Sequence, residues 1–158
     1  MTDDAGSAID PAELALERRR WGELSDLMAS LTPSQAMTAG YFEESWSAKD
    51  MLAHIGAWLA EAGAVLEQIR SGTFRADEID IDAMNARFLA DMADVPLEIV
   101  RIQATASRSR MLSAWASLPR RTTDADGWLR KAGAEHYDEH LPRLREWVVE
   151  LRRSSTAR

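Results

Sequence analysis

The chain has 158 residues and a formal net charge of −7, with 46% hydrophobic and 28% charged residues. This length fits one domain with its own hydrophobic core, and the negative charge argues against nucleic-acid binding, because phosphate contacts need a basic surface. The chain has no cysteine, which excludes disulfides, thiolate nucleophiles and cysteine metal ligands. Any metal would therefore be bound by histidine, carboxylate or water.

The sequence contains no stretch of eighteen apolar residues, so it predicts neither a transmembrane helix nor a membrane partner. The first ten residues, MTDDAGSAID, are acidic and lack the basic and apolar regions of a signal peptide, which predicts a cytoplasmic protein. We expect a disordered leader at 1–9, a single helical domain at 10–152 and a loose tail at 153–158.

Apolar residues recur at helical spacing along most of the chain. A first helix is predicted at 11–31, where Asp10 can act as the N-cap and Glu13 would complete a capping box. The following residues, 33–45, form a connection with room for one short helical turn.

The second helix has recognisable signals at both ends. Ser47 is its expected N-cap, with Asp50 at the third helical position, and Gly72 ends it. Three further helices are predicted, at 82–93, 97–118 and 126–152.

Pro142 lies inside the last predicted helix and should bend it, because proline removes one backbone hydrogen bond. No segment alternates with a period of two for long enough to form a strand. The fold class is therefore all-α, with four long helices and one short extra helix in the second crossover.

Histidine occurs three times, as His54, His136 and His140. Residues 136 and 140 are four apart, which puts both imidazoles on one face of a helix, and both fall on its apolar stripe. A buried polar group needs a partner, and a metal ion would partner both rings. His54 lies on the flank of the second helix's apolar face and could supply a third ligand. The alternative is that all three are packed histidines with ordinary hydrogen-bond partners.

Four residues near the histidines are candidates for orienting the imidazoles or lining a pocket. They are Asp50, Glu139, Tyr137 and Trp46. Asp50 and Glu139 can equally be read as a helix cap and a solvated surface charge. Tyr137 could donate a proton at the site, but it points about 100° away from His136 on a helical wheel, which favours packing. Trp46 precedes the second helix and could form a pocket wall.

Two segments resemble signatures of a known superfamily. WSAKDMLAHIGAW, at 46–58, resembles the second-helix signature W-S-x-K-D-x-L-x-H-x-x-x-W of the DinB-like (DinB/YfiT) superfamily. GAEHYDEHLPRLREW, at 133–147, resembles its last-helix pattern H-x-x-x-H. LTPSQAMTAGYFEES, at 31–45, is similar to the usual lead-in, and NARFLADMADVPLEIV, at 85–100, resembles a segment of the ClbS/DfsB branch. The resemblance covers most of 11–150.

The resemblance implies a four-helix bundle with the helix order up-down-down-up, often a homodimer. Many members of the superfamily bind a divalent metal, zinc or nickel, through one histidine of the second helix and two of the last. These fall on His54, His136 and His140.

Three functions are compatible with this sequence. The resemblance favours a metal-dependent enzyme that transfers a low-molecular-weight thiol, such as mycothiol or bacillithiol, to a small electrophile, or hydrolyses that electrophile. A ClbS/DfsB-like self-protection protein would instead hydrolyse or sequester a reactive metabolite without an essential metal. The third reading is a non-catalytic dimeric bundle.

Overall fold

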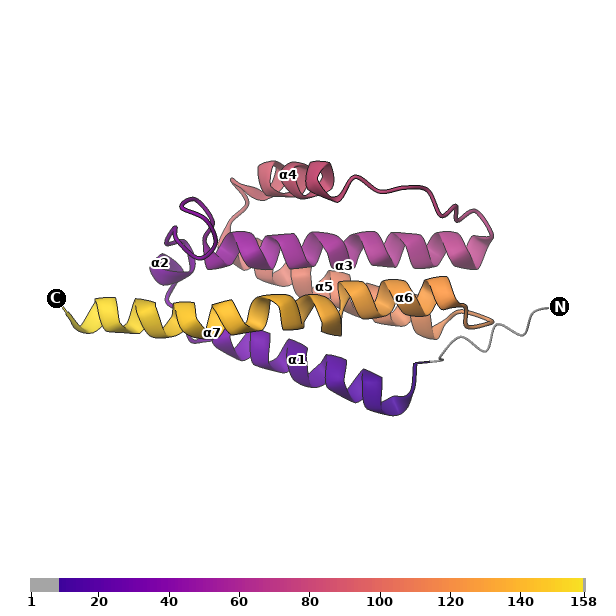
Figure 1. Cartoon of the computed structure of the whole chain (residues 1–158), viewed down its shortest axis with the longest axis horizontal. Helices are drawn as coiled ribbons and strands as arrows, with labels where there is room; N and C mark the ends of the chain where they lie inside the picture. Colours follow the sequence, from indigo (N-terminus) through magenta and orange to yellow (C-terminus); the bar gives the residue numbers. More distant parts are fainter. Residues whose placement is uncertain (1–8, 158) are drawn as a thin grey trace.

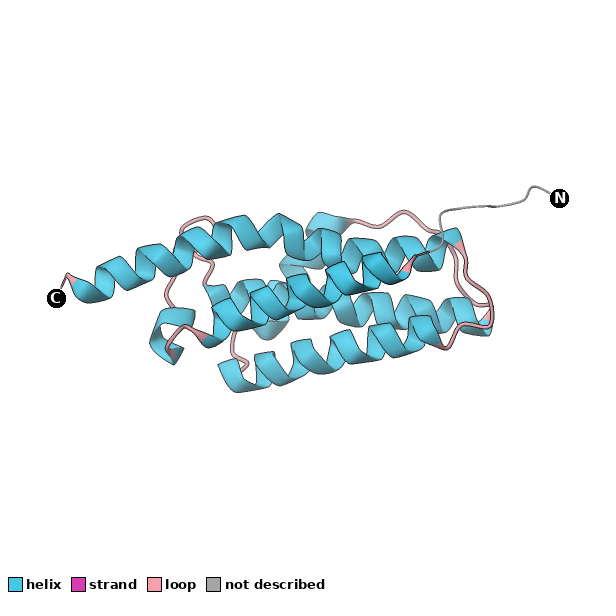
Figure 2. Ribbon diagram, turned by 90° about the horizontal axis from the view of Figure 1, so that it is seen from below, coloured by secondary structure: helices cyan, strands magenta, loops and turns pink. Residues whose placement is uncertain are grey.

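A computed structural model describes residues 9–157, and the regular elements of this part of the chain are seven helices, with no strand. The helices are α1 (Pro11–Ala29), α2 (Pro33–Ala36), α3 (Ala48–Ser71), α4 (Ile81–Met92), α5 (Leu97–Ala116), α6 (Thr123–Ala132) and α7 (Ala134–Thr156). The all-α prediction is confirmed (Figures 1 and 2). In the described part of the chain, no helix has the length and apolar character needed to cross a membrane. The expected leader lies outside the described residues, except for Ile9, which packs partly buried against the core.

The helix ends follow from local hydrogen bonds. The predicted capping box of α3 is confirmed, because Ser47 Oγ accepts from the backbone N–H of Asp50 while Asp50 accepts from Ser47. Asp10 caps α1 as predicted, by accepting from the backbone N–H of Glu13 at 2.9 Å. The carboxylate of Glu13, expected to complete a capping box, pairs chiefly with Arg130 of α6 through two hydrogen bonds, with a weaker backbone contribution from Asp10.

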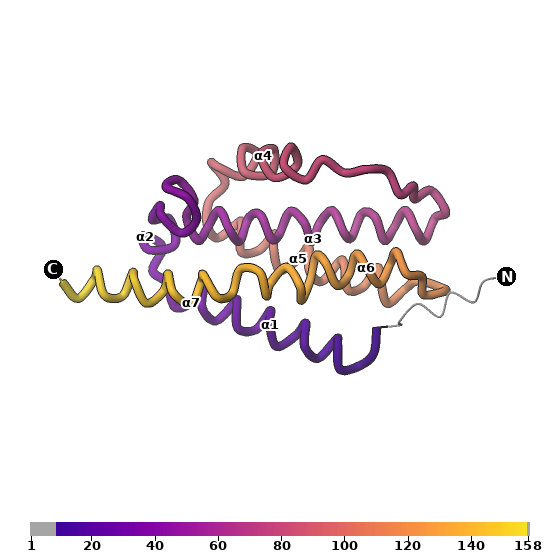
Figure 3. The backbone as a smooth tube through the Cα atoms, viewed as in Figure 1, coloured from indigo at the N-terminus to yellow at the C-terminus, as the bar shows by residue number. Residues whose placement is uncertain are grey.

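The long helices lie side by side along the longest axis of the molecule (Figure 1). α1 runs toward the end where α2 lies, α3 and α5 both run away from it, and α6 and α7 lead back. α3 packs most extensively against α5, and α1 packs against α7. α4 lies along the outer side of α3, away from the other helices (Figure 3).

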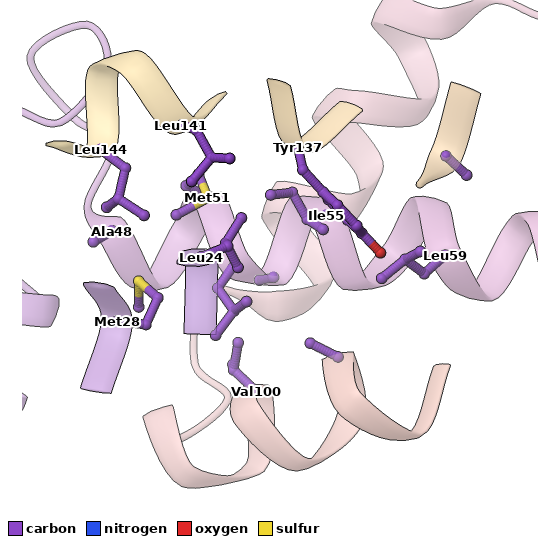
Figure 4. Packing of buried hydrophobic residues seen from close by; sticks show 14 of the residues in the cluster. Leu24, Met28, Ala48, Met51, Ile55, Leu59, Val100, Tyr137, Leu141 and Leu144 are labelled. Atoms are coloured by element: carbon purple, nitrogen blue, oxygen red, sulfur yellow. The ribbon is translucent and has the colours of Figure 1, made fainter. Parts of the chain in front are cut away.

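Side chains from α1, α3, α5 and α7 meet in one hydrophobic core (Figure 4). Buried side chains of all four helices are labelled there: Leu24, Met28, Ala48, Met51, Ile55, Leu59, Val100, Tyr137, Leu141 and Leu144. The core joins α3 to α7, which are the two helices that bear the histidines.

The last predicted helix is in fact two helices. The chain breaks at Gly133, between α6 and α7, whereas 126–152 was expected to be continuous. A Cβ atom at this position would lie 2.7 Å from the carbonyl oxygen of Leu129, so the close backbone approach requires glycine. Pro142 lies within α7, which continues through it.

The loose tail expected at 153–158 is also wrong for the described residues. α7 continues to Thr156, and the side-chain amide of Gln35 in α2 donates to Ser155 Oγ at 3.1 Å. Residue 158 lies outside the described part of the chain.

Gly133→Ala should lower the free energy of unfolding by about 1–3 kcal/mol, because the added methyl group would force the break between α6 and α7 to move. Gly127→Ala is the matched control, since a Cβ at Gly127 meets nothing within 4 Å. That control should raise stability by about 0.5–1 kcal/mol through better helix propensity. Urea denaturation of both variants measures the difference, and equal effects would contradict the role of Gly133.

Candidate metal centre

The three histidines of the chain meet at one place. His54 lies on α3, and His136 and His140 lie one turn apart on α7. Nε2 of His136 is 2.9 Å from Nε2 of His54 and 3.2 Å from Nε2 of His140. One nitrogen of each ring lies within 4.8 Å of the other two, so this group could hold a metal ion.

The nitrogen spacing suits a single ion. Around tetrahedral zinc with Zn–N bonds of about 2.0–2.1 Å, two ligand nitrogens lie about 3.3 Å apart. The two measured separations, 2.9 and 3.2 Å, are slightly shorter. All three nitrogens lie within 4.8 Å of one another, so a small rearrangement of the rings would place them around one ion.

Hydrogen bonding alone does not satisfy the cluster. A neutral imidazole carries either one hydrogen or one lone pair at Nε2. Nε2 of His136 can therefore make one linear hydrogen bond, either with His54 or with His140, although it is close to both. A divalent ion would accept a lone pair from all three rings at once, so the donor set fits a metal better than it fits a hydrogen-bonded core.

Burial keeps the three rings neutral. His54 and His136 expose 9% and 7% of their surface, and His140 is partly buried. Desolvation lowers the pKa of His54 and the pKa of His140 to about 4 each. Desolvation, reinforced by the neighbouring imidazoles, lowers the pKa of His136 to about 2. Neutral imidazole is the form that binds divalent metals, so the site is electrostatically ready for one at pH 7.

Tyr41 is a site residue that sequence analysis missed. Its hydroxyl lies 3.2 Å from Nδ1 of His140 and 3.4 Å from the carbonyl oxygen of the same residue. The side chain is 2% exposed, and burial raises its pKa. Tyr41 stands in a loop without helical periodicity and contacts a residue 99 positions later, so no local pattern indicates this contact.

Trp46, the residue expected as a possible pocket wall, lies against His54 of the triad. Its ring centroid is 5.5 Å from that of His54, in an edge-to-face arrangement. Phe42 packs edge-on against Trp46 at 5.8 Å and is itself 53% exposed. The loop at residues 40–46, called here the 40–46 loop, therefore packs two aromatic rings in sequence against His54.

Asp50 acts as a helix cap, and Glu139 is a surface residue. Asp50 accepts hydrogen bonds from the backbone N–H and the hydroxyl of Ser47, both at 2.9 Å, in its role as a helix cap. Nδ1 of His54 has no hydrogen-bond partner in the described chain, so Asp50 does not orient that ring. Glu139 is exposed on the surface of α7.

Tyr137 belongs to a second polar cluster, on a different side of α7. Its hydroxyl donates to Glu17 at 3.1 Å, and Arg108 donates two hydrogen bonds of 2.7 Å to the same carboxylate. Glu17 is only 4% exposed. The cluster links α1, α5 and α7, and the two hydrogen bonds from Arg108 hold Glu17 without Tyr137.

Comparison with known proteins finds a similar fold but no named function. No protein-family model and no curated protein sequence matches the chain. The chain is similar to the crystal structure of an uncharacterised protein from Escherichia coli UTI89, with a TM-score of 0.73 and 14% sequence identity. The match covers 88% of this chain and 92% of that chain. At this identity the likeness shows a common fold alone.

The metal-free protein should lose stability as the pH falls from 6.5 to 5. The histidine pKa is 6.5 in the unfolded chain and about 4 or lower in the folded chain, so only the unfolded chain takes up these protons in this range. Each histidine then contributes at most about 1.4 kcal/mol per pH unit. Urea denaturation in the presence of a chelator measures the slope.

The His140→Gln variant should show a shallower slope over the same pH range, because its unfolded chain has one proton-binding site fewer. A free energy of unfolding that does not change between pH 6.5 and 5 would contradict the burial of neutral imidazoles.

Proposed function

We propose that this chain is a divalent-metal-dependent enzyme that transfers a low-molecular-weight thiol to a small electrophilic substrate or hydrolyses that substrate. The observation that carries the proposal is the convergence of three neutral imidazole nitrogens from α3 and α7. Nitrogen ligands of this kind suit zinc or nickel. When bound, the ion supplies a Lewis acid that lowers the pKa of a water or thiol ligand.

The number of ligands favours catalysis over a purely structural role. Structural zinc sites use four protein ligands, whereas catalytic sites use three and keep one position for water or substrate. Among the described residues, the group holds three histidines and no fourth histidine, cysteine, aspartate or glutamate. The described protein residues would thus leave room for a reactant.

The residues of the site would have different roles. His54, His136 and His140 would hold the ion, and the aromatic rings of Trp46 and Phe42 would limit access of water. The chain has no cysteine, so a thiol nucleophile must come from a cosubstrate.

For the fold we propose a DinB-like four-helix bundle with up-down-down-up order. The directions of α1, α3, α5 and α7 in Figure 1 support this order. The two segments that resemble the superfamily, 46–58 and 133–147, are also the ones that carry the histidines.

Elemental analysis of the untagged protein, purified without chelator, should find about one zinc or nickel ion per chain. His136→Ala and His140→Ala should each lose the ion, because two imidazoles bind far more weakly than three. Glu139→Gln is the matched control, since Glu139 neighbours His140 but is exposed, and it should keep the ion. No metal in the wild type, even after dialysis against zinc or nickel, would refute the proposal.

Activity should follow metal content. The metal-loaded protein is mixed with a chromogenic aryl halide or epoxide, with and without mycothiol, bacillithiol or glutathione. Product formation that needs the thiol would indicate transfer, and product formation without it would indicate hydrolysis. In both cases chelation should abolish turnover. Turnover that survives complete removal of metal would instead favour the metal-independent self-protection function.

A further inference from the structure

Tyr41 makes two contacts with one residue of the triad. Its oxygen is 3.2 Å from Nδ1 of His140 and 3.4 Å from the carbonyl oxygen of His140. Both contacts are satisfied together when the single hydroxyl hydrogen of Tyr41 points toward the carbonyl, which can only accept. The tyrosine oxygen is then left to accept the Nδ1–H of His140. Protonation at Nδ1 leaves the lone pair of that ring at Nε2, which is the atom that faces His136.

The 40–46 loop that carries Tyr41 is fastened to α7. Arg143 lies three residues after His140 and donates to the backbone carbonyls of Tyr41 at 2.6 Å and Gly40 at 3.0 Å. The loop is closed on itself, because Gly40 N–H and Tyr41 N–H both donate to the carbonyl of Trp46. Gly40 has a φ of +113°, which strains any residue with a side chain, and a Cβ there would lie 3.0 Å from the indole of Trp147.

We infer that Tyr41 is a positioning residue of the metal centre, which accepts the Nδ1–H of His140 and so keeps the Nε2 lone pair directed at the ion. This inference rests on the proposed metal site. Because Tyr41 belongs to the 40–46 loop, occupation of the site and closure of the loop over His54 and His140 support one another. The loop residues Tyr41 and Trp46 each contact a different histidine of the triad.

The chain offers a matched pair of variants to test this inference. Tyr41→Phe and Tyr137→Phe each remove one hydroxyl from a buried tyrosine, 2% and 0% exposed respectively. The hydroxyl of Tyr137 contacts Glu17, whereas that of Tyr41 contacts the triad. Both variants should lose similar stability without metal, so a difference between them in metal binding reports on the triad itself.

Zinc affinity is measured by competition with a chromogenic chelator, and the visible spectrum is recorded after loading with Co²⁺. Tyr41→Phe should bind zinc about 10–100-fold more weakly than the wild type, as expected when a hydrogen-bond partner of a ligating imidazole is removed. Its Co²⁺ spectrum should also shift. Tyr137→Phe should match the wild type in both measurements.

Backbone amide exchange supplies a second readout. Zinc should slow exchange at Gly40 and Tyr41 in the wild type and in Tyr137→Phe, but not in Tyr41→Phe. Should Tyr41→Phe fail to fold, Arg143→Gln tests the same coupling, since it releases the loop and leaves the triad intact, and it should also weaken zinc binding.

If Tyr41→Phe binds zinc as tightly as the wild type, the inference is overturned but the metal site is not. The same holds for Arg143→Gln if Tyr41→Phe does not fold. A wild type that binds no zinc would overturn the inference and the proposed function together. The two failures are therefore distinguishable.

Discussion

Three imidazoles packed against one another in a buried place are the constraint on which this structure depends. Burying a polar ring is unfavourable unless its nitrogens find partners. Nε2 of His136 lies close to Nε2 of both His54 and His140. It can form a linear hydrogen bond with only one of them. The metal proposal accounts for this arrangement, since an ion would satisfy all three rings.

α7, which bears two of these rings, has polar contacts on two sides. On one side, the hydroxyl of Tyr137 and the guanidinium of Arg108 meet at the carboxylate of Glu17. On the other side, Tyr41 contacts His140 from the 40–46 loop. The break at Gly133 separates α7 from α6 about one turn before His136, so the two histidines lie on a helix of their own.

Much of this could be predicted from the sequence, because the signals are local. The cap of α3 is set by Ser47 and Asp50, three residues apart, and the helices follow from the period of their apolar residues. The triad was predictable as a group because His136 and His140 share one helical face and fall on an apolar stripe. A spacing of four residues and a stripe are properties of one helix and need no tertiary information.

What sequence analysis missed depends on residues far apart in the chain. Glu13 fits a capping box locally, but its carboxylate also forms an ion pair with Arg130, 117 residues later. Gly133, where the last helix breaks, lies near Glu17 of α1 and Met111 of α5. Tyr41 joins the site only because α7 returns beside the 40–46 loop. Each of these contacts follows from packing between elements, which periodicity and capping do not describe.

Anomalous diffraction at the zinc absorption edge, from crystals of zinc-loaded protein, tests the central claim most directly. The account predicts one strong peak per chain within bonding distance of Nε2 of His54, His136 and His140. The absence of a peak there, or a peak bound by other residues, would contradict it and return the three histidines to the role of packed core side chains.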